Sequence, residues 1–199
     1  MKQRTLTILL LLIIVKVFAM ANTENLTTTN DKLRKNAIKV TFLSLFTGST
    51  KLTYERAIGQ FQSNEITVGM IGAGYDGKHN KPLGVTARYA HKFIFAGNNT
   101  YALNGWYAKP ELIYSYFHYN PQDGSPRTYS SMGTIMGLIG YQWAKHLFTI
   151  DGFFGLGYAF GKEADTYYEH GFALWNYVGT KNRNLSICFG AKIGLAFGK

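Results

Sequence analysis

The chain has 199 residues and carries 21 Lys and Arg against 11 Asp and Glu, a formal net charge of +10. Charged residues make up only 16 % of it, below the roughly 25 % usual in soluble domains, which argues against a surface that faces water everywhere. The length suits one domain, and the single cysteine excludes an internal disulfide. The basic residues form no dense cluster of the kind that binds nucleic acid, so we expect no nucleic-acid partner.

The first 21 residues have the pattern of a secretory signal peptide. Lys2 and Arg4 precede an apolar run from Leu6 to Val15, and Ala19-Met20-Ala21 offers small residues for cleavage. A helix that spans a membrane needs about 20 apolar residues, and this run is shorter. We therefore expect residues 1–21 to be removed during export.

From Ala37 onward, apolar and polar residues alternate with a period of two, which is typical of strands rather than helices. Residues 22–36 are polar and lack this pattern, so we expect a flexible periplasmic lead segment before a barrel of residues 37–199. Most of the alternating segments are about as long as the 9 to 11 residues with which a tilted strand crosses a bilayer. Eight segments alternate in this way: Ala37 to Leu45, Lys51 to Ile58, Glu65 to Ala73, Gly84 to Lys92, Gly105 to Phe117, Gly133 to Trp143, Phe148 to Phe160 and Leu185 to Phe197.

The connections between these segments differ in length from one end to the other. With an even number of strands and both termini on one side, the first, third, fifth and seventh connections lie at the far end. Three of these four are long and rich in turn residues, whereas two of the other three are short. Outer-membrane barrels have short periplasmic turns and longer external loops. The sequence therefore predicts an all-β, eight-stranded, antiparallel up-and-down transmembrane β-barrel.

The alternation also separates an apolar face from a face of small and polar residues. In the segment Leu185 to Phe197, Ile187 and Phe189 alternate with Ser186 and Cys188. The outward face of a soluble barrel is densely charged because it meets water, but the polar face here carries about one charge per strand. We expect the apolar face to contact outer-membrane lipid. A secreted soluble barrel that holds an apolar ligand inside remains the alternative.

The polar face supplies a set of four cations and three anions that would line the lumen. The interior of an eight-stranded barrel is just wide enough for side chains to fill it, so we expect these charges to pair and close the lumen. A proton or ion path through the barrel is the alternative interpretation of the same charges. The predicted lumen network comprises Lys39, Glu55, Arg88, Lys109, Glu111, Asp151 and Lys192.

The segment Gly105 to Phe117 combines aromatic residues with a proline. Trp106, with Tyr141 and Trp143, falls near the predicted strand ends and fits an interfacial girdle of aromatic residues. Pro110 cannot donate a hydrogen bond to a neighbouring strand, and a closed barrel has no edge strand to accommodate it. We therefore expect a bulge or locally broken pairing at Pro110.

Several stretches resemble segments of the small outer-membrane β-barrel proteins of Bacteroidota, a family of uncharacterised function. The stretches are "NAIKVTFLSLFTGSTKLTYERAIG", "GWYAKPELIYSYF", and "IGYQW" followed by "FTIDGFFGLGYAFG". The similarity runs from about Asn36 to the C-terminus, and its motifs, Tyr54-Glu55-Arg56 and Lys109-Pro110-Glu111, specify a fold rather than a chemistry. The resemblance implies residence in the outer membrane of a Gram-negative cell and brings no known substrate. We expect a monomer that the barrel-assembly machinery inserts.

No motif points to a cofactor or a metal ion. The residues Gly72 to Gly77 match the dinucleotide fingerprint GxGxxG, but the following residues predict a loop and not the helix that this site needs. The five histidines lack the close spacing of zinc ligands, although a loop site made of His79, His118 and His170 is an alternative.

Catalysis is not predicted either, so we expect a structural or surface-interaction role. A lipid-modifying enzyme, with His118 near Ser130 or Ser131 and Glu169, is the alternative that would need these residues on one face. The last connection is rich in aromatic residues, which either pack over the barrel mouth or anchor a partner. These candidate interaction residues are Tyr167, Tyr168, Phe172, Trp175 and Tyr177.

Overall fold

The computed structural model divides the chain into two units, Met1–Lys32 and Leu33–Lys199. The residues that it describes all belong to the second unit, so the predicted signal peptide and most of the predicted lead segment lie outside them. Within the described part of the chain, no helix is long and apolar enough to cross a membrane. The described residues are 34–59, 61–77, 79–96, 103–122, 124–145, 147–162, 171–173 and 184–198.

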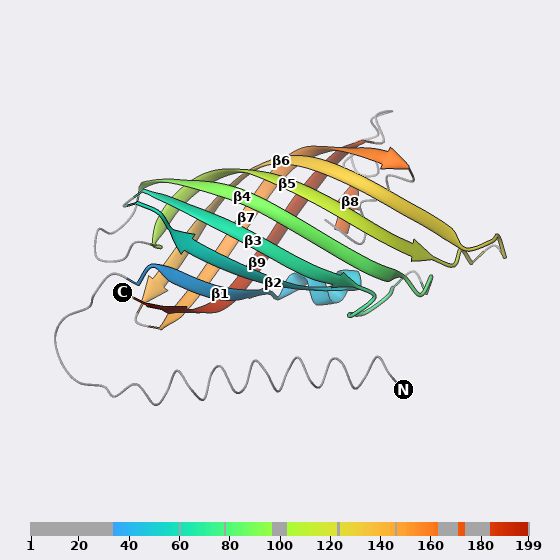
Figure 1. Ribbon diagram of the computed structural model, residues 1–199, viewed down its shortest axis with the longest axis horizontal. Coiled ribbons are helices and arrows are strands. Elements are labelled where there is room, and N and C mark those ends of the chain that lie inside the picture. The colour runs from blue at the N-terminus through green and yellow to red at the C-terminus, as the bar shows by residue number, and fades with distance from the viewer. Residues whose placement is uncertain are drawn as a thin grey trace. The chain divides into compact units, whose positions relative to one another are not determined.

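The described residues form nine strands and one short 3-10 helix. Each of the first six strands pairs antiparallel with the next, β7 pairs with β9, and β9 pairs with β1 (Figure 1). This closure confirms the predicted all-β, eight-stranded, antiparallel up-and-down barrel. The elements are β1 (Asn36–Thr41), η1 (Leu43–Thr47), β2 (Ser49–Ala57), β3 (Gln62–Ile71), β4 (Leu83–Ala96), β5 (Gly105–Tyr119), β6 (Thr128–Lys145), β7 (Phe148–Lys162), β8 (Gly171–Ala173) and β9 (Leu185–Phe197).

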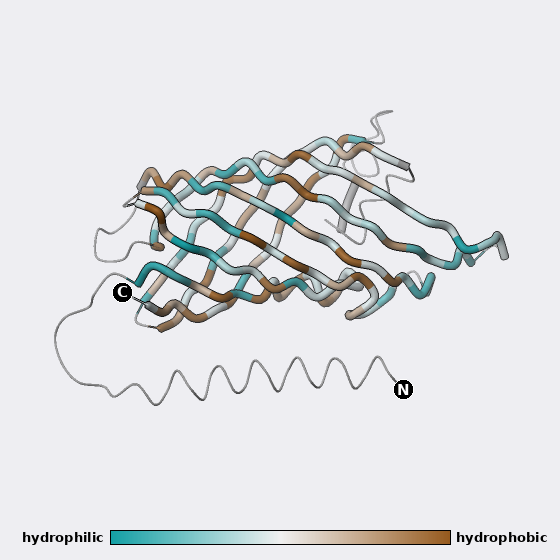
Figure 2. Tube along the Cα trace, viewed as in Figure 1, coloured by the Kyte–Doolittle hydropathy of each residue, from teal (hydrophilic) through white to brown (hydrophobic). Residues whose placement is uncertain are grey.

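The side chains alternate between the inside and the outside of the barrel wall. In β6, buried and exposed residues follow one another from Gly133 to Lys145, as strand geometry requires. The buried positions of β2 and β3 are mostly polar, whereas most of their exposed positions are apolar. Figure 2 shows hydrophilic and hydrophobic residues interspersed along the strands. The barrel is thus polar inside and apolar outside, the reverse of a soluble protein.

The first strand is shorter than predicted, because β1 ends at Thr41 and not at Leu45. The Ser44 hydroxyl donates to the Thr41 carbonyl at 2.8 Å, and the Thr47 hydroxyl donates to the Ser44 carbonyl at 3.1 Å. Such local bonds compete with strand pairing and favour the turn of η1. Gly48, with φ of 78°, then adopts the left-handed conformation that ends this turn.

The early end of β1 leaves part of the β9 edge for another segment. β1 pairs with β9 only from Lys192 to Phe197. The short strand β8, which the sequence did not predict, pairs with β9 at Ser186, Ile187 and Cys188. An unpaired strand edge exposes backbone donors and acceptors, so β8 satisfies groups that β1 does not reach.

The connections confirm the predicted asymmetry between the two ends of the barrel. We call the end where β1 begins and β9 ends the near end, and the opposite end, which carries η1, the far end. The fourth connection was predicted to start after Lys92, but β4 continues to Ala96 and leaves a shorter turn. Near-end connections are 58–61, 97–104 and 146–147, and far-end connections are 42–48, 72–82, 120–127 and 163–184.

Pairing is broken at Pro110, as predicted, but on one side only. Between β4 and β5, the pairs run from Ala90 with Glu111 to Phe93 with Ala108, and neither Pro110 nor Lys109 has a partner between them. On the other side, Pro110 pairs with Gly137 in an unbroken ladder. The missing donor of proline thus interrupts the pairing without changing its register, and the recorded bulge lies farther along, between Ile94 and Ala96.

Two glycines of β6 differ in the space around them, and this difference gives a matched pair of substitutions. A Cβ at Gly140 would overlap the Tyr107 ring and the Gly152 carbonyl, whereas one at Gly137 would meet no atom within 4 Å. We expect Gly140→Ala to lower the free energy of unfolding by about 1–3 kcal/mol, as overpacking does. Gly137→Ala should leave it unchanged within about 0.5 kcal/mol or raise it slightly. Urea unfolding of the refolded barrel measures both, and equal effects would contradict the inward placement of Gly140.

Candidate functional site

The most unusual feature of the barrel is the charge buried in its interior. Among the described residues, ten charged side chains are buried, six of them cations and four of them anions. They come from seven of the eight barrel strands, at the inward positions of the alternating pattern. The buried charged residues are Lys39, Lys51, Glu55, Glu65, Arg88, Lys92, Lys109, Glu111, Asp151 and Lys192.

A single carboxylate, that of Glu65 on β3, lies at the centre of this network. Its Oε1 is 2.9 Å from the Nζ of Lys39 and 3.1 Å from that of Lys92. Its Oε2 is 2.5 Å from the Nζ of Lys109 and 3.0 Å from that of Lys192. Glu65 is only 1 % exposed, so these contacts replace the water that a charged group would otherwise bind.

On the near side of Glu65, two of these lysines share two further carboxylates. The Nζ atoms of Lys39 and Lys92 lie 2.8 and 2.9 Å from Oδ2 of Asp151. They also lie 2.5 and 3.1 Å from the carboxylate of Glu55. The Tyr107 hydroxyl donates to Oδ1 of Asp151 at 2.5 Å, and its ring lies 4.1 Å from the Nζ of Lys92. Each charge here therefore has several partners.

A neutral amide completes this part of the network. The side-chain carbonyl of Gln142 accepts a hydrogen bond from Lys39 at 3.1 Å and one from Lys92 at 2.5 Å. Its Nε2 donates to the Glu55 carboxylate at 3.0 Å. An amide suits this position because it is both acceptor and donor and adds no charge.

Toward the far end, the network continues through Arg88 and Glu111. The Arg88 guanidinium donates to Oε1 of Glu111 at 3.0 Å, and the Nζ of Lys109 lies 3.1 Å from Oε2 of Glu111. The Phe153 ring lies 5.5 Å from the Nζ atoms of both Lys109 and Lys192, within the range of a cation–π interaction. The structure thus places all seven predicted lumen residues inside the barrel and joins them through ion pairs.

Apolar side chains fill the near end of the lumen. Ala37, Ala57, Leu103 and Ala196 form a buried cluster there, next to the strand ends. Leu103, only 1 % exposed, comes from the connection before β5 and folds into the barrel. The ion network and this apolar cluster therefore follow one another along the lumen.

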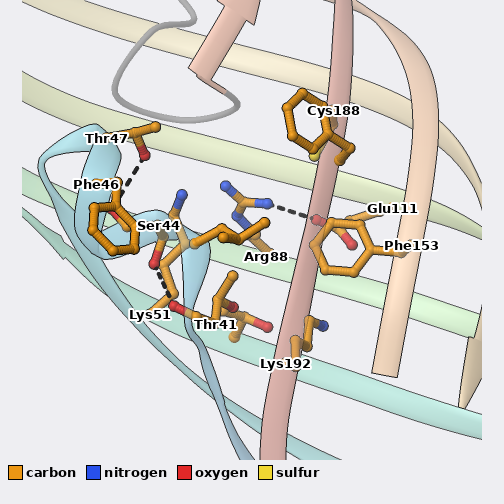
Figure 3. A pocket seen from close by; sticks show the side chains of 13 residues that line it. Thr41, Ser44, Phe46, Thr47, Lys51, Arg88, Glu111, Phe153, Cys188 and Lys192 are labelled. Carbon is orange, nitrogen blue, oxygen red and sulfur yellow. Dashed lines mark hydrogen bonds and ion pairs between the residues drawn. The ribbon is translucent and has the colours of Figure 1, made fainter. Parts of the chain in front are cut away.

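The far end retains a cavity. It has a volume of about 180 Å³ and lies between η1 and the inner wall (Figure 3). Lys51, Arg88, Glu111 and Lys192 line it together with residues of η1. Figure 3 shows η1 on one side of the cavity and Glu111, Phe153 and Cys188 on the other.

Several residues of the ion network were not predicted from the sequence, although the period-two alternation indicates three of them. The alternation that placed the predicted network residues inside the barrel also places Glu65, Lys92 and Lys51 there. Each of them, however, was the first or last residue of a predicted segment. In the structure, β2, β3 and β4 extend past these ends. Gln142 carries no charge, so a search for charged residues could not single it out.

The structure describes only part of the alternative enzyme site. His118 lies next to Phe117, which points inward, and its ring packs against Tyr129 with the centroids 5.7 Å apart. Ser130 is fully buried and faces the lumen, whereas Ser131 shares a hydrogen bond of 3.1 Å with the exposed hydroxyl of Tyr114. Glu169, the predicted acid, lies outside the described residues.

The other sites considered from the sequence are a metal site, the GxGxxG match and the aromatic residues of the last connection. Among the described residues, no group of three His, Cys, Asp or Glu is arranged to hold a metal ion. Gly72, the first residue of the GxGxxG match, has φ of 93° and begins a turn after β3 rather than a helix. Of the predicted interaction residues, Phe172 lies on β8. The other four, Tyr167, Tyr168, Trp175 and Tyr177, lie outside the described residues.

A double-substitution experiment tests whether Glu65 neutralises the surrounding lysines. Glu65→Gln should lower the free energy of unfolding by about 3–5 kcal/mol, because it leaves buried cations uncompensated. Adding Lys192→Met should restore at least about 1 kcal/mol, because one of those cations is removed. Adding Lys145→Met, at an exposed position of β6, serves as the control and should restore nothing. Equal restoration by both second substitutions, measured by urea unfolding, would contradict the role of Glu65.

Comparisons with known proteins add no further assignment. None of the protein-family models, curated proteins or solved structures searched matches this chain. The resemblance to the Bacteroidota barrel family therefore stays a prediction.

Proposed function

We propose that this protein is a small outer-membrane β-barrel with a closed, charge-paired lumen and a structural or surface-interaction role without catalysis. The observation that carries the proposal is the inverted arrangement of polarity, with ionic side chains inside and apolar side chains outside.

The outer face is apolar along the middle of the barrel strands. Ile66, Val85 and Ile139 are 55, 61 and 58 % exposed, and similar side chains occupy the outward positions of neighbouring strands. Soluble monomers rarely expose continuous apolar patches larger than a few hundred Å². Hydrocarbon, in contrast, is a favourable environment for such a surface, which supports contact with lipid.

Aromatic residues on the outer face lie toward both strand ends. β6 carries Tyr129 toward the far end and Tyr141 and Trp143 toward the near end, with Ile135 and Ile139 between them. β7 carries Phe148 near and Tyr158 and Phe160 far, with Ile150, Phe154 and Leu156 between them. Trp106 and Tyr141 pack with their ring centroids 5.2 Å apart. Two aromatic girdles around an aliphatic band are typical of outer-membrane barrels.

The inner face disfavours the alternative of a soluble barrel with an apolar ligand inside. Pockets for such ligands are lined mainly by apolar side chains. Ten charged side chains are buried in this interior among the described residues, and they contact one another rather than enclose a large apolar space. The apolar cluster at the near end also gives no support to an ion path.

The proposal extends to location and partners. The predicted signal peptide, residues 1–21, would direct export, and the short near-end turns would face the periplasm. Lipid and the barrel-assembly machinery would then be its partners, and a monomer is expected. A surface-interaction role would belong to the longer far-end connections, where Tyr167, Tyr168, Phe172, Trp175 and Tyr177 occur in the sequence.

Cell fractionation and electrophoresis test this proposal directly. We expect the protein in the outer-membrane fraction, and we expect the unboiled sample to migrate differently from the boiled one because a closed barrel resists the detergent. A soluble enzyme of the periplasm serves as the fractionation control. Recovery of the protein in the soluble periplasmic fraction, without any detergent, would contradict the proposal.

A further inference from the structure

A cavity lies below η1 in the described lumen, and cationic side chains contribute to its lining. Among the described residues, it is lined by three cationic side chains, Lys51, Arg88 and Lys192, and by the carboxylate of Glu111. The three cations are 3, 9 and 4 % exposed, so water screens their charges poorly. Such a lining attracts an anion.

The neighbouring carboxylates are already shared among several cations. Glu111 contacts both Arg88, at 3.0 Å, and Lys109, at 3.1 Å. Lys192 contacts Glu65 at 3.0 Å, but Glu65 also contacts three other lysines. Within the described residues, the six buried cations exceed the four buried anions, and three of these cations line the cavity.

The size and the donors of the cavity fit a phosphate group. At about 180 Å³, and with roughly 30 Å³ per water molecule, it has room for a phosphate but not for a nucleotide. A phosphate monoester carries a charge of about −1.5 to −2 near neutral pH, opposite in sign to the three cationic side chains among the described lining residues. Arginine and lysine are the usual partners of phosphate oxygens, and both are present.

The cavity also reaches the seam of the barrel where β1 gives way to η1. Phe46 of η1 and Phe189 of β9 both line it, and they are 59 and 48 % exposed. At this seam, the Phe42 amide donates to the Ala191 carbonyl at 2.9 Å, the last backbone bond before η1 begins. A ligand in the cavity could therefore extend an apolar part along the aromatic outer surface.

We propose that the cavity formed by Lys51, Arg88 and Lys192 below η1 binds a phosphate group, that of a free phosphate or of an anionic lipid whose apolar part contacts Phe46 and Phe189. The site is independent of the membrane location proposed above. Binding is measured on purified, folded protein, so a failure of fractionation and a failure of phosphate binding are distinct results.

The test is calorimetric titration of the full chain, folded in a neutral detergent and free of phosphate buffer. The probes are inorganic phosphate, dihexanoyl phosphatidic acid and, as a zwitterionic comparison, dihexanoyl phosphatidylcholine. Lys51→Gln and Arg88→Gln each remove one charge from the cavity and should weaken phosphate binding about tenfold or more. Lys145→Gln, at the near end of β6, removes one exposed charge and should leave binding unchanged.

The outcomes separate the two sources of the phosphate group. Tighter binding of the phosphatidic acid than of phosphate assigns the site to a lipid head group, and comparable binding assigns it to a free phosphate. The shift in migration on boiling confirms that each variant is folded, and either cavity variant suffices for the comparison. The proposal is overturned by a lack of saturable binding of both anionic probes at millimolar concentrations. It is equally overturned if the folded cavity variants bind like the wild type, or if phosphatidylcholine binds as tightly as phosphatidic acid.

Discussion

The barrel interior depends on one carboxylate that is surrounded by four ammonium groups. Glu65 of β3 contacts lysines from β1, β4, β5 and β9, so a single side chain links five of the eight barrel strands. An uncompensated buried charge costs several kcal/mol, and these charges meet only in the native register. A slip of one residue would turn an inward charge outward, because strand side chains alternate. We therefore interpret the network as a device that fixes register and closure as well as one that fills space.

The two faces of the wall have opposite polarities for a common reason. The strands alternate, so the inward positions that hold the paired charges, small polar residues and a few apolar clusters leave most of the large apolar side chains outside. In water this arrangement would expose a wide apolar band, and in a bilayer it places that band in hydrocarbon. The aromatic residues near both strand ends then occupy the depth at which an interface is expected. An apolar cluster lies at the near end of the lumen, whereas the cavity and the longer connections lie at the far end.

The parts of the structure that follow from local alternation were predictable from the sequence, and those that depend on contacts between distant strands were not. The period of two gave the eight strands, the inward position of Lys39 or Asp151, and the interrupted pairing at Pro110. The roles of Glu65 and Lys92 were missed because each was a terminal residue of a predicted segment, and the strands extend beyond both. Neither η1 nor β8 has a periodic sequence pattern. A local hydrogen bond of Ser44 stabilises η1, and β8 consists of three residues that pair with the edge of β9. The cavity arises where these two elements replace a longer β1, so no single segment encodes it.

The central claim is that the apolar outer face contacts lipid while charge is sealed inside. Spin labels attached to Ile135→Cys, on the outer face of β6, and to Ser125→Cys, in a far-end connection, test it in reconstituted vesicles. Both substitutions are made in a Cys188→Ser background, because Cys188 is the only native cysteine. The account predicts that the label at 135 is accessible to oxygen and protected from a water-soluble nickel chelate, whereas the label at 125 is accessible to the chelate. Equal access of the chelate to both labels would contradict it.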